Sequence, residues 1–174
     1  MGLGQTMLTI MALMLMGRLI LSINTTTLDV GFTKDMSEYR IAATSLGTSM
    51  LEKANALAFD EKTVDAAVSA TTALTSASYL KAETGELTED NFDDIDDYNN
   101  FIKYDTLSGV IYKTRVKVEY VDIVSNIISS SSSQKFNKKI SVYITSDYLL
   151  NYSTQVPTAD TLYFQSVFSY WYFR

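Results

Sequence analysis

The chain has no histidine, no cysteine and a single proline among its 174 residues. Without imidazole or thiolate groups it cannot form a Ser-His-Asp or Cys-His catalytic group, a zinc or haem site ligated by such side chains, or a disulfide. Any catalysis would have to use carboxylates, lysines, tyrosines or hydroxyls. We therefore expect a protein that is not an enzyme, with no catalytic residues and no organic cofactor.

Acidic residues outnumber basic residues, and the charged residues are unevenly distributed along the chain. The net charge is −6, which argues against a nucleic-acid partner because such proteins normally present a basic face. Residues 1–28 contain one ionisable side chain, Arg18, whereas residues 83–105 contain nine carboxylates and one lysine. These two segments are thus suited to different surroundings.

The N-terminal region is apolar on every helical face from Met7 to Ile23. This pattern predicts a helix inside a membrane or a bundle rather than an amphipathic surface helix. This run is slightly shorter than the ~20 residues needed to cross a bilayer. The longer stretch from Leu3 to Leu28 reaches that length only by including Asn24 and the three threonines that follow it. A secretory signal peptide is disfavoured, because no basic segment precedes the run and no small-residue cleavage site follows it.

A second helical pattern begins directly after this run. Apolar residues recur at spacings of three and four, as in an amphipathic helix: Phe32, Met36, Tyr39, Ala43, Leu46, Met50, Ala54 and Leu57. We predict one helix from Gln5 to Phe59, about 80 Å long at 1.5 Å per residue. Gly17 marks a point of bending or unwinding, because an interior glycine costs about 1 kcal/mol.

Beyond the helix the period changes to two, which is typical of half-buried strands. We predict strands at Val110–Tyr120 and Lys139–Thr145, an exposed serine-rich hairpin loop between them, and an aromatic terminal strand from Thr161. Basic residues at 113, 115, 117, 135, 138 and 139 fall on solvated strand faces in this reading. The expected fold is α+β, with a long N-terminal helix packed against a small antiparallel sheet. We expect residues 1–31 to form an apolar half-helix that serves as a membrane anchor or as the core of a helix bundle, and residues 32–174 to form a head domain that includes the amphipathic half-helix 32–59.

The acidic block has three interpretations. Its carboxylates at Asp93, Asp94, Asp96 and Asp97 are the hard oxygen ligands that calcium prefers. They also suit a turn whose side chains cap backbone amides, or a solvated loop. The loop is not an EF-hand, because glycine and glutamate are missing from the required positions. Since its apolar residues recur every three positions, we expect a helical turn on the sheet with its carboxylates outward.

Particular segments of the chain resemble the type IV pilin family. FDDIDDYNN (Phe92–Asn100) is similar to the Asp-Val-Asp-Asp-Tyr segment of minor pilins of the mannose-sensitive haemagglutinin type. YKTRVKVEYVD (Tyr112–Asp122) and KKISVYITS (Lys138–Ser146) resemble the two strands that follow it there. The resemblance implies a subunit held in the inner membrane by its N-terminal helix and then packed with its own copies into an extracellular filament. Its further partners would be the pilus assembly machinery and prepilin peptidase.

The N-terminus departs from the family pattern. The family usually carries a glutamate as the fifth mature residue, which pairs with a neighbour's terminal amine. Gln5 stands there if Met1 is the mature terminus, which is the register we favour. Alternatively, Gly4 ends a four-residue leader and Gln5 is the first mature residue. In the first register a neutral amide replaces the charge at lower desolvation cost.

Arg18 and Asp29 are the remaining candidate assembly residues. On an ideal helix they lie about 16 Å apart along the axis, so they meet only between subunits displaced by that distance. Such a pair would compensate a buried charge, whereas snorkelling to an interface is the simpler explanation of Arg18. Two other functions stay open. They are a membrane-anchored module that binds a cation or glycan, and a pseudopilin of a secretion system.

Overall fold

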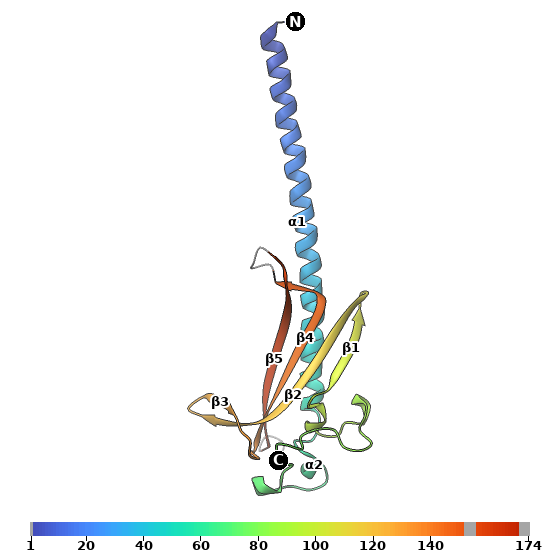
Figure 1. Ribbon diagram of the computed structural model, residues 1–174, viewed down its shortest axis with the longest axis vertical. Helices are drawn as coiled ribbons and strands as arrows, with labels where there is room; N and C mark the ends of the chain where they lie inside the picture. The colour runs from blue at the N-terminus through green and yellow to red at the C-terminus, as the bar shows by residue number, and fades with distance from the viewer. Residues whose placement is uncertain (1, 152–155, 171–174) are drawn as a thin grey trace. The chain divides into compact units, whose positions relative to one another are not determined.

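The structure is a computed structural model that describes residues 2–151 and 156–170 (Figure 1). Met1, one of the candidate assembly residues, lies outside the described residues, as does the end of the predicted terminal strand. The chain divides into two compact units, Met1–Tyr39 and Arg40–Arg174. The fold is α+β, with one long N-terminal helix packed against a small antiparallel sheet, as predicted.

Helix α1 runs over 53 residues, Leu3–Asn55, without interruption. The prediction of one continuous helix is therefore confirmed, although the helix ends four residues before Phe59. Gly17 is α-helical, so the predicted unwinding there is wrong for this structure. Threonines do not break the apolar segment, because hydroxyls such as that of Thr26 donate to carbonyls one turn back, 2.9 Å from Ser22 O.

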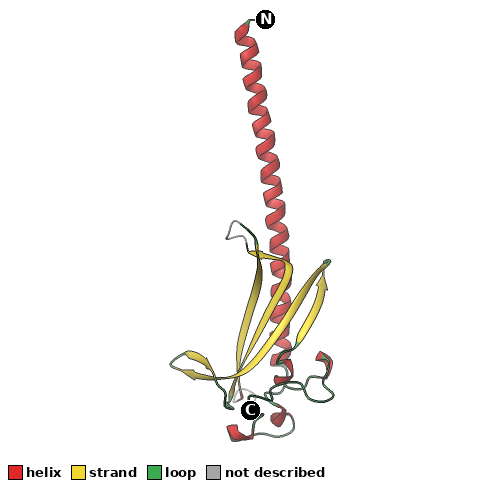
Figure 2. Cartoon of the chain, in the orientation of Figure 1, coloured by secondary structure: helices red, strands yellow, loops and turns green. Residues whose placement is uncertain are grey.

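The sheet contains five antiparallel strands in the order β1-β2-β4-β5, with β3 paired to β2 (Figure 2). Their bounds are β1 Ile102–Leu107, β2 Val110–Val124, β3 Ile127–Ser130, β4 Asn137–Asn151 and β5 Thr158–Ser169. The strands predicted from the two-residue period are confirmed as parts of β2 and β4. The serine-rich segment was predicted as a loop, but it contains β3. Strand β1 was not predicted.

The core lies on one face of the sheet. Alternate residues of β2 from Val110 to Tyr120 are buried, as are Ile140, Val142 and Ile144 of β4. In α1 the buried residues are Ala43, Gly47, Met50 and Ala54. Ala43, Met50 and Ala54 belong to the predicted apolar stripe, whereas Gly47 does not. Gly47 lacks a side chain where a Cβ atom would overlap the ring of Phe164 in β5. The close approach of α1 and β5 therefore depends on glycine at this position.

The segment between α1 and β1 has little regular structure. It holds the short helix α2 (Glu61–Val64) and the 3-10 turns η1 (Thr71–Ala73), η2 (Glu89–Asn91) and η3 (Asp96–Tyr98). The predicted period of three is confirmed here, because Phe92, Ile95 and Tyr98 are buried. These side chains hold an acidic segment against the sheet.

Candidate functional site

The first candidate site is the apolar surface of α1. Between Leu3 and Val30 the large hydrophobic side chains are 53% to 83% exposed: Leu3, Met7, Leu8, Ile10, Met11, Leu13, Met14, Leu15, Met16, Leu19, Ile20, Leu21, Ile23, Leu28 and Val30. By length and composition the helix is able to cross a membrane. A continuous apolar surface of this size marks a site of membrane or protein contact.

The predicted assembly residues lie along this helix. Gln5 is in the first turn, where its backbone N–H donates to Gly2 O at 2.9 Å. Gly17 and Arg18 follow in the apolar segment, and Asp29 lies near its end. Among the described residues, neither Arg18 nor Asp29 forms an ion pair within the chain. The structure of one chain thus does not bring these two residues together.

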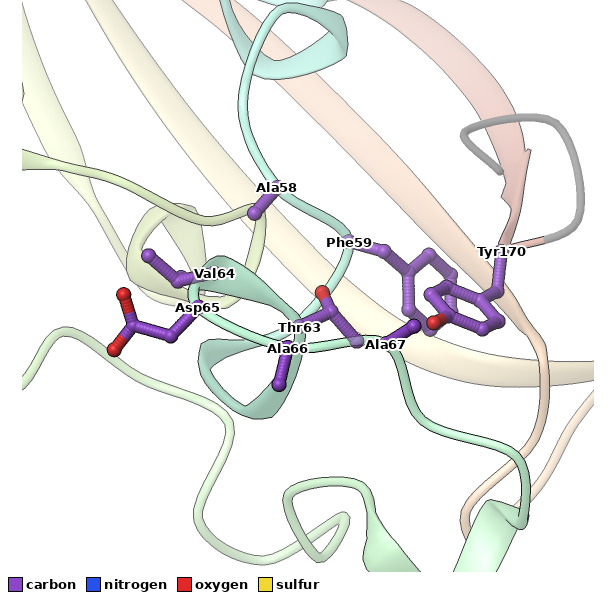
Figure 3. Close-up of a pocket in the computed structure, with 8 residues that line it drawn as sticks. All are labelled: Ala58, Phe59, Thr63, Val64, Asp65, Ala66, Ala67 and Tyr170. Atoms are coloured by element: carbon purple, nitrogen blue, oxygen red, sulfur yellow. The ribbon is translucent and has the colours of Figure 1, made fainter.

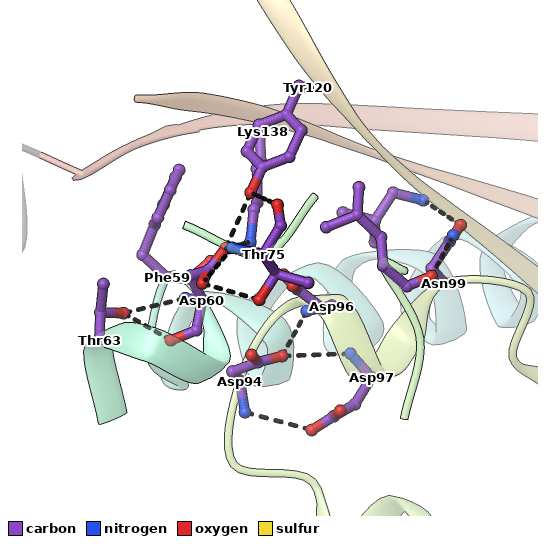
Figure 4. A network of polar contacts seen from close by, with 12 residues as sticks. Phe59, Asp60, Thr63, Thr75, Asp94, Asp96, Asp97, Asn99, Tyr120 and Lys138 are labelled. Atoms are coloured by element: carbon purple, nitrogen blue, oxygen red, sulfur yellow. Dashed lines mark hydrogen bonds and ion pairs between the residues drawn. The ribbon is translucent and has the colours of Figure 1, made fainter. Parts of the chain in front are cut away.

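The second candidate site lies in the head, beside a buried lysine. Lys138 of β4 is fully buried, contrary to its predicted place on a solvated face. Its Nζ lies 2.8 Å from Asp60 Oδ2, donates to Phe59 O at 2.7 Å, and also forms an ion pair with Asp96 (Figure 4). One lysine therefore links the end of α1, the acidic turn and the sheet.

The two carboxylates beside Lys138 respond differently to their surroundings. Burial alone would raise the pKa of Asp60, but the charge of Lys138 and several hydrogen bonds hold it below its ordinary value. Tyr120 Oη and Thr75 N, which lie 2.8 and 3.0 Å from carboxylate oxygens of Asp60, contribute to this effect. Burial dominates at Asp96 and raises its pKa to about 7, despite Lys138. Asp60 is thus the principal counter-charge of Lys138.

The acidic turn is a capping structure, which was one of the three interpretations. Asp94 Oδ1 accepts hydrogen bonds from the backbone N–H groups of Asp96 at 2.6 Å and Asp97 at 3.2 Å. Asp97 Oδ2 accepts from the N–H groups of Asp93 at 3.0 Å and Asp94 at 3.2 Å (Figure 4). The expectations of outward carboxylates and of a solvated loop are wrong for Asp94, Asp96 and Asp97, which are buried. A tight turn leaves buried N–H groups that need acceptors, and these aspartates supply them.

Six carboxylates from three segments converge beside this turn, and we call them the acidic cluster: Glu61, Glu83, Glu86, Asp93, Asp94 and Asp97. They form three overlapping groups, in each of which carboxylate oxygens lie within 4.8 Å of one another. Each group contains two of Glu61, Glu86 and Asp93, together with one of the other three. Asp93, Asp94 and Asp97 were predicted candidates, Asp96 belongs to Lys138 instead, and the three glutamates were missed.

Burial and the closeness of like charges raise the pKa values of carboxyl groups in the acidic cluster. Burial, followed by neighbouring carboxylates, raises the pKa of Asp94 to about 9. Burial and the Glu86 carboxylate raise the pKa of Glu83 to about 7. Burial also raises the pKa of Asp97 to about 6, although backbone hydrogen bonds oppose it. Burial and the neighbouring carboxylates thus outweigh the charge of Lys138, which opposes them at Asp94.

A shallow pocket of about 250 Å³ lies near the end of α1 (Figure 3). It is lined by Ala58, Phe59, Thr63, Val64, Asp65, Ala66, Ala67 and Tyr170. The Tyr170 hydroxyl accepts a hydrogen bond from Val68 N at 2.8 Å, and its ring packs on Phe59 with centroids 5.6 Å apart. The lining holds a single carboxylate, Asp65. It does not assemble the convergent polar groups typical of a ligand site.

The chain was compared with protein-family models, curated proteins and solved structures, and none of them matches it.

Proposed function

We propose that this chain is a structural subunit, similar to type IV pilins, that polymerises through the apolar half of α1 into an extracellular filament. The observation that carries the proposal is the continuity of α1. A helix whose first half exposes apolar side chains on all faces extends without a break into a second half that packs on a folded head. A bundle of such helices, surrounded by heads, would cover the apolar surface.

Before assembly the same surface is suited to the inner membrane. Transfer of the helix from lipid to a bundle of helices exchanges one apolar environment for another, so the hydrophobic effect gives little net drive. Close packing and interhelical polar contacts then have to favour the bundle. Gln5 and Arg18 are polar groups in a largely apolar segment, and such groups inside membranes usually serve a function.

Arg18 has a specific role in this proposal. It pairs with Asp29 of a neighbouring subunit displaced by about 16 Å along the axis, which is 11 residues at 1.5 Å each. The pair would remove the cost of burying either charge alone. Gln5 would accept a hydrogen bond from a neighbour in place of the family's glutamate.

Charge reversal tests both parts of the proposal. Cells that produce the chain are sheared, and the released material is sedimented and probed for the subunit. We expect the wild-type chain in the filament pellet, loss of pelleted subunit in Arg18→Asp and in Asp29→Arg, and recovery in the double variant. Failure of the double variant to recover refutes the pairing. Absence of the wild-type chain from the pellet refutes the filament itself.

The alternative is a membrane-anchored module, in which α1 only holds the head at the membrane. The acidic cluster favours a cation as its ligand. An anchor, however, does not require the apolar stripe to continue as one helix from the membrane segment into the head. In the shearing experiment a module would stay with the membranes, which distinguishes it from the filament subunit.

A further inference from the structure

The acidic cluster has a feature that an ordinary capping turn does not require. Asp94 and Asp97 are 0% and 3% exposed, and each uses only one carboxylate oxygen for backbone N–H groups. Asp94 Oδ2 and Asp97 Oδ1 are buried and have no hydrogen-bond partner among the described residues. Glu83 Oε2 is in the same condition. Buried carboxyl oxygens without partners are costly, so each carboxyl group needs a proton or a cation.

Three of the five described residues with an orphaned buried oxygen belong to the carboxylate groups, whereas Asp96 and Thr114 do not. Asp94 completes the group that contains Glu61 and Asp93. Asp97 completes the group that contains Glu86 and Asp93, and Glu83 the group that contains Glu61 and Glu86. Each group thus holds one residue with an orphaned oxygen, and all three groups meet at the same three carboxylates.

The missing partner carries positive charge. Among the described residues none of the six carboxylates forms an ion pair with a lysine or arginine. Lys138 is nearby and its charge opposes the rise in the pKa of Asp94, but it forms its hydrogen bonds and ion pairs with Asp60, Asp96 and Phe59 O. Among the described residues no lysine or arginine therefore pairs directly with the acidic cluster.

We propose that the acidic cluster binds a calcium ion, with its ligands drawn from the three overlapping groups, in which Glu61, Glu86 and Asp93 each occur twice. Calcium takes six to eight oxygen ligands at 2.3–2.6 Å, so two ligands on one ion lie at most about 5 Å apart. The carboxylate oxygens of each group are close enough together to share one ion. Calcium also tolerates irregular geometry, whereas magnesium demands a near-ideal octahedron.

The ion would join three segments that are distant in sequence. Glu61 lies in α2, Glu83 and Glu86 lie before η2, and the aspartates lie around the acidic turn. These segments contain little regular structure, so a shared ion would order them as a unit. The site is independent of the proposed filament, since it lies wholly within the head.

The test compares two neighbouring aspartates in the full-length chain. Asp93 is exposed and belongs to two of the carboxylate groups. Asp90 is also exposed and belongs to none of them. Asp93→Asn and Asp90→Asn remove the same charge from the same block. The variants are purified in non-ionic detergent, freed of divalent ions with EDTA, and titrated with CaCl₂ or MgCl₂ by calorimetry and thermal unfolding.

We expect saturable heat and a higher Tm with calcium for the wild type and Asp90→Asn, and a much smaller response to magnesium. Asp93→Asn should lose most of the calcium response, while its Tm in EDTA equals or exceeds that of the wild type because repulsion is relieved. This combination separates a ligand from a residue that only supports the fold. The proposal is overturned if the wild type shows no calcium response, or if Asp93→Asn responds like Asp90→Asn. An equal response to magnesium would overturn the assignment to calcium.

Discussion

Replacement of Lys138 by methionine should strongly destabilise the head. Methionine has a similar length but no charge, so Asp60 loses its counter-charge in a site where both side chains are 0% exposed. Three buried groups, which are the Asp60 and Asp96 carboxylates and Phe59 O, lose a donor. Each unsatisfied buried acceptor costs about 1–3 kcal/mol, and removal of one partner of a buried ion pair typically costs about 3–5 kcal/mol in total. We expect a loss in this range, against about 5–15 kcal/mol for a whole domain.

Urea denaturation of the full-length chain in non-ionic detergent measures this loss, with amide hydrogen exchange in β2 and β4 as a second readout. Lys117→Met is the matched control. Lys117 lies 2.6 Å from Glu119 but its side chain is 54% exposed, so its loss should cost less than about 1 kcal/mol. Adding Asp60→Asn to Lys138→Met should restore part of the stability, because the uncompensated charge is then gone. A Lys138→Met chain within 1 kcal/mol of the wild type would refute the buried network.

Two further predictions concern the same head and use the same assay. Gly47→Ala should cost about 1–3 kcal/mol by overpacking against Phe164, whereas Gly31→Ala, with open space around it, should be neutral or stabilising by up to about 1 kcal/mol. Equal effects of the two would contradict the close packing of α1 on β5. Although burial opposes it, hydrogen bonds from Lys117 and Lys139 lower the pKa of Glu119 to about 2. Its stabilisation is therefore present above about pH 4.5 and is lost as the pH falls toward 2. Glu119→Gln should lose about 1–2 kcal/mol at pH 7, discounted for the exposure of Lys117, and only a small part of that at pH 2, where Glu119 of the folded chain is close to half protonated. A loss that does not change with pH would refute the ion pair.

The helix and the central strands can be predicted from the sequence because each is indicated by a pattern among neighbouring residues. The absence of proline and the apolar period identify α1, and alternation identifies β2 and β4. Alternation does not identify β1, which is short and charged, or β3, which lies in a serine-rich run. The residues of their hairpin turns indicate these strands better than the strand sequences do. Ser108-Gly109 and Ser125-Asn126 both have positive φ angles, as two-residue hairpins require.

The buried polar groups of the head could not be predicted in the same way. The spacing of Phe92, Ile95 and Tyr98 correctly indicated that the acidic turn packs on the sheet. The burial of its carboxylates depends on Lys138, which is more than 40 residues further along the chain, and on backbone N–H groups in a tight turn. The acidic cluster likewise requires Glu61 and Glu83 from separate segments, and no local pattern in the sequence brings them together.

The central claim is that the apolar half of α1 forms the core of a filament made of this chain. It is tested most directly by negative-stain microscopy of filaments sheared from the source cells, with mass spectrometry of their dominant subunit. The account predicts long filaments composed of this chain, with a mass that begins at Met1 or, in the alternative register, at Gln5. Filaments built from another protein, with this chain retained in the membrane fraction, would contradict it.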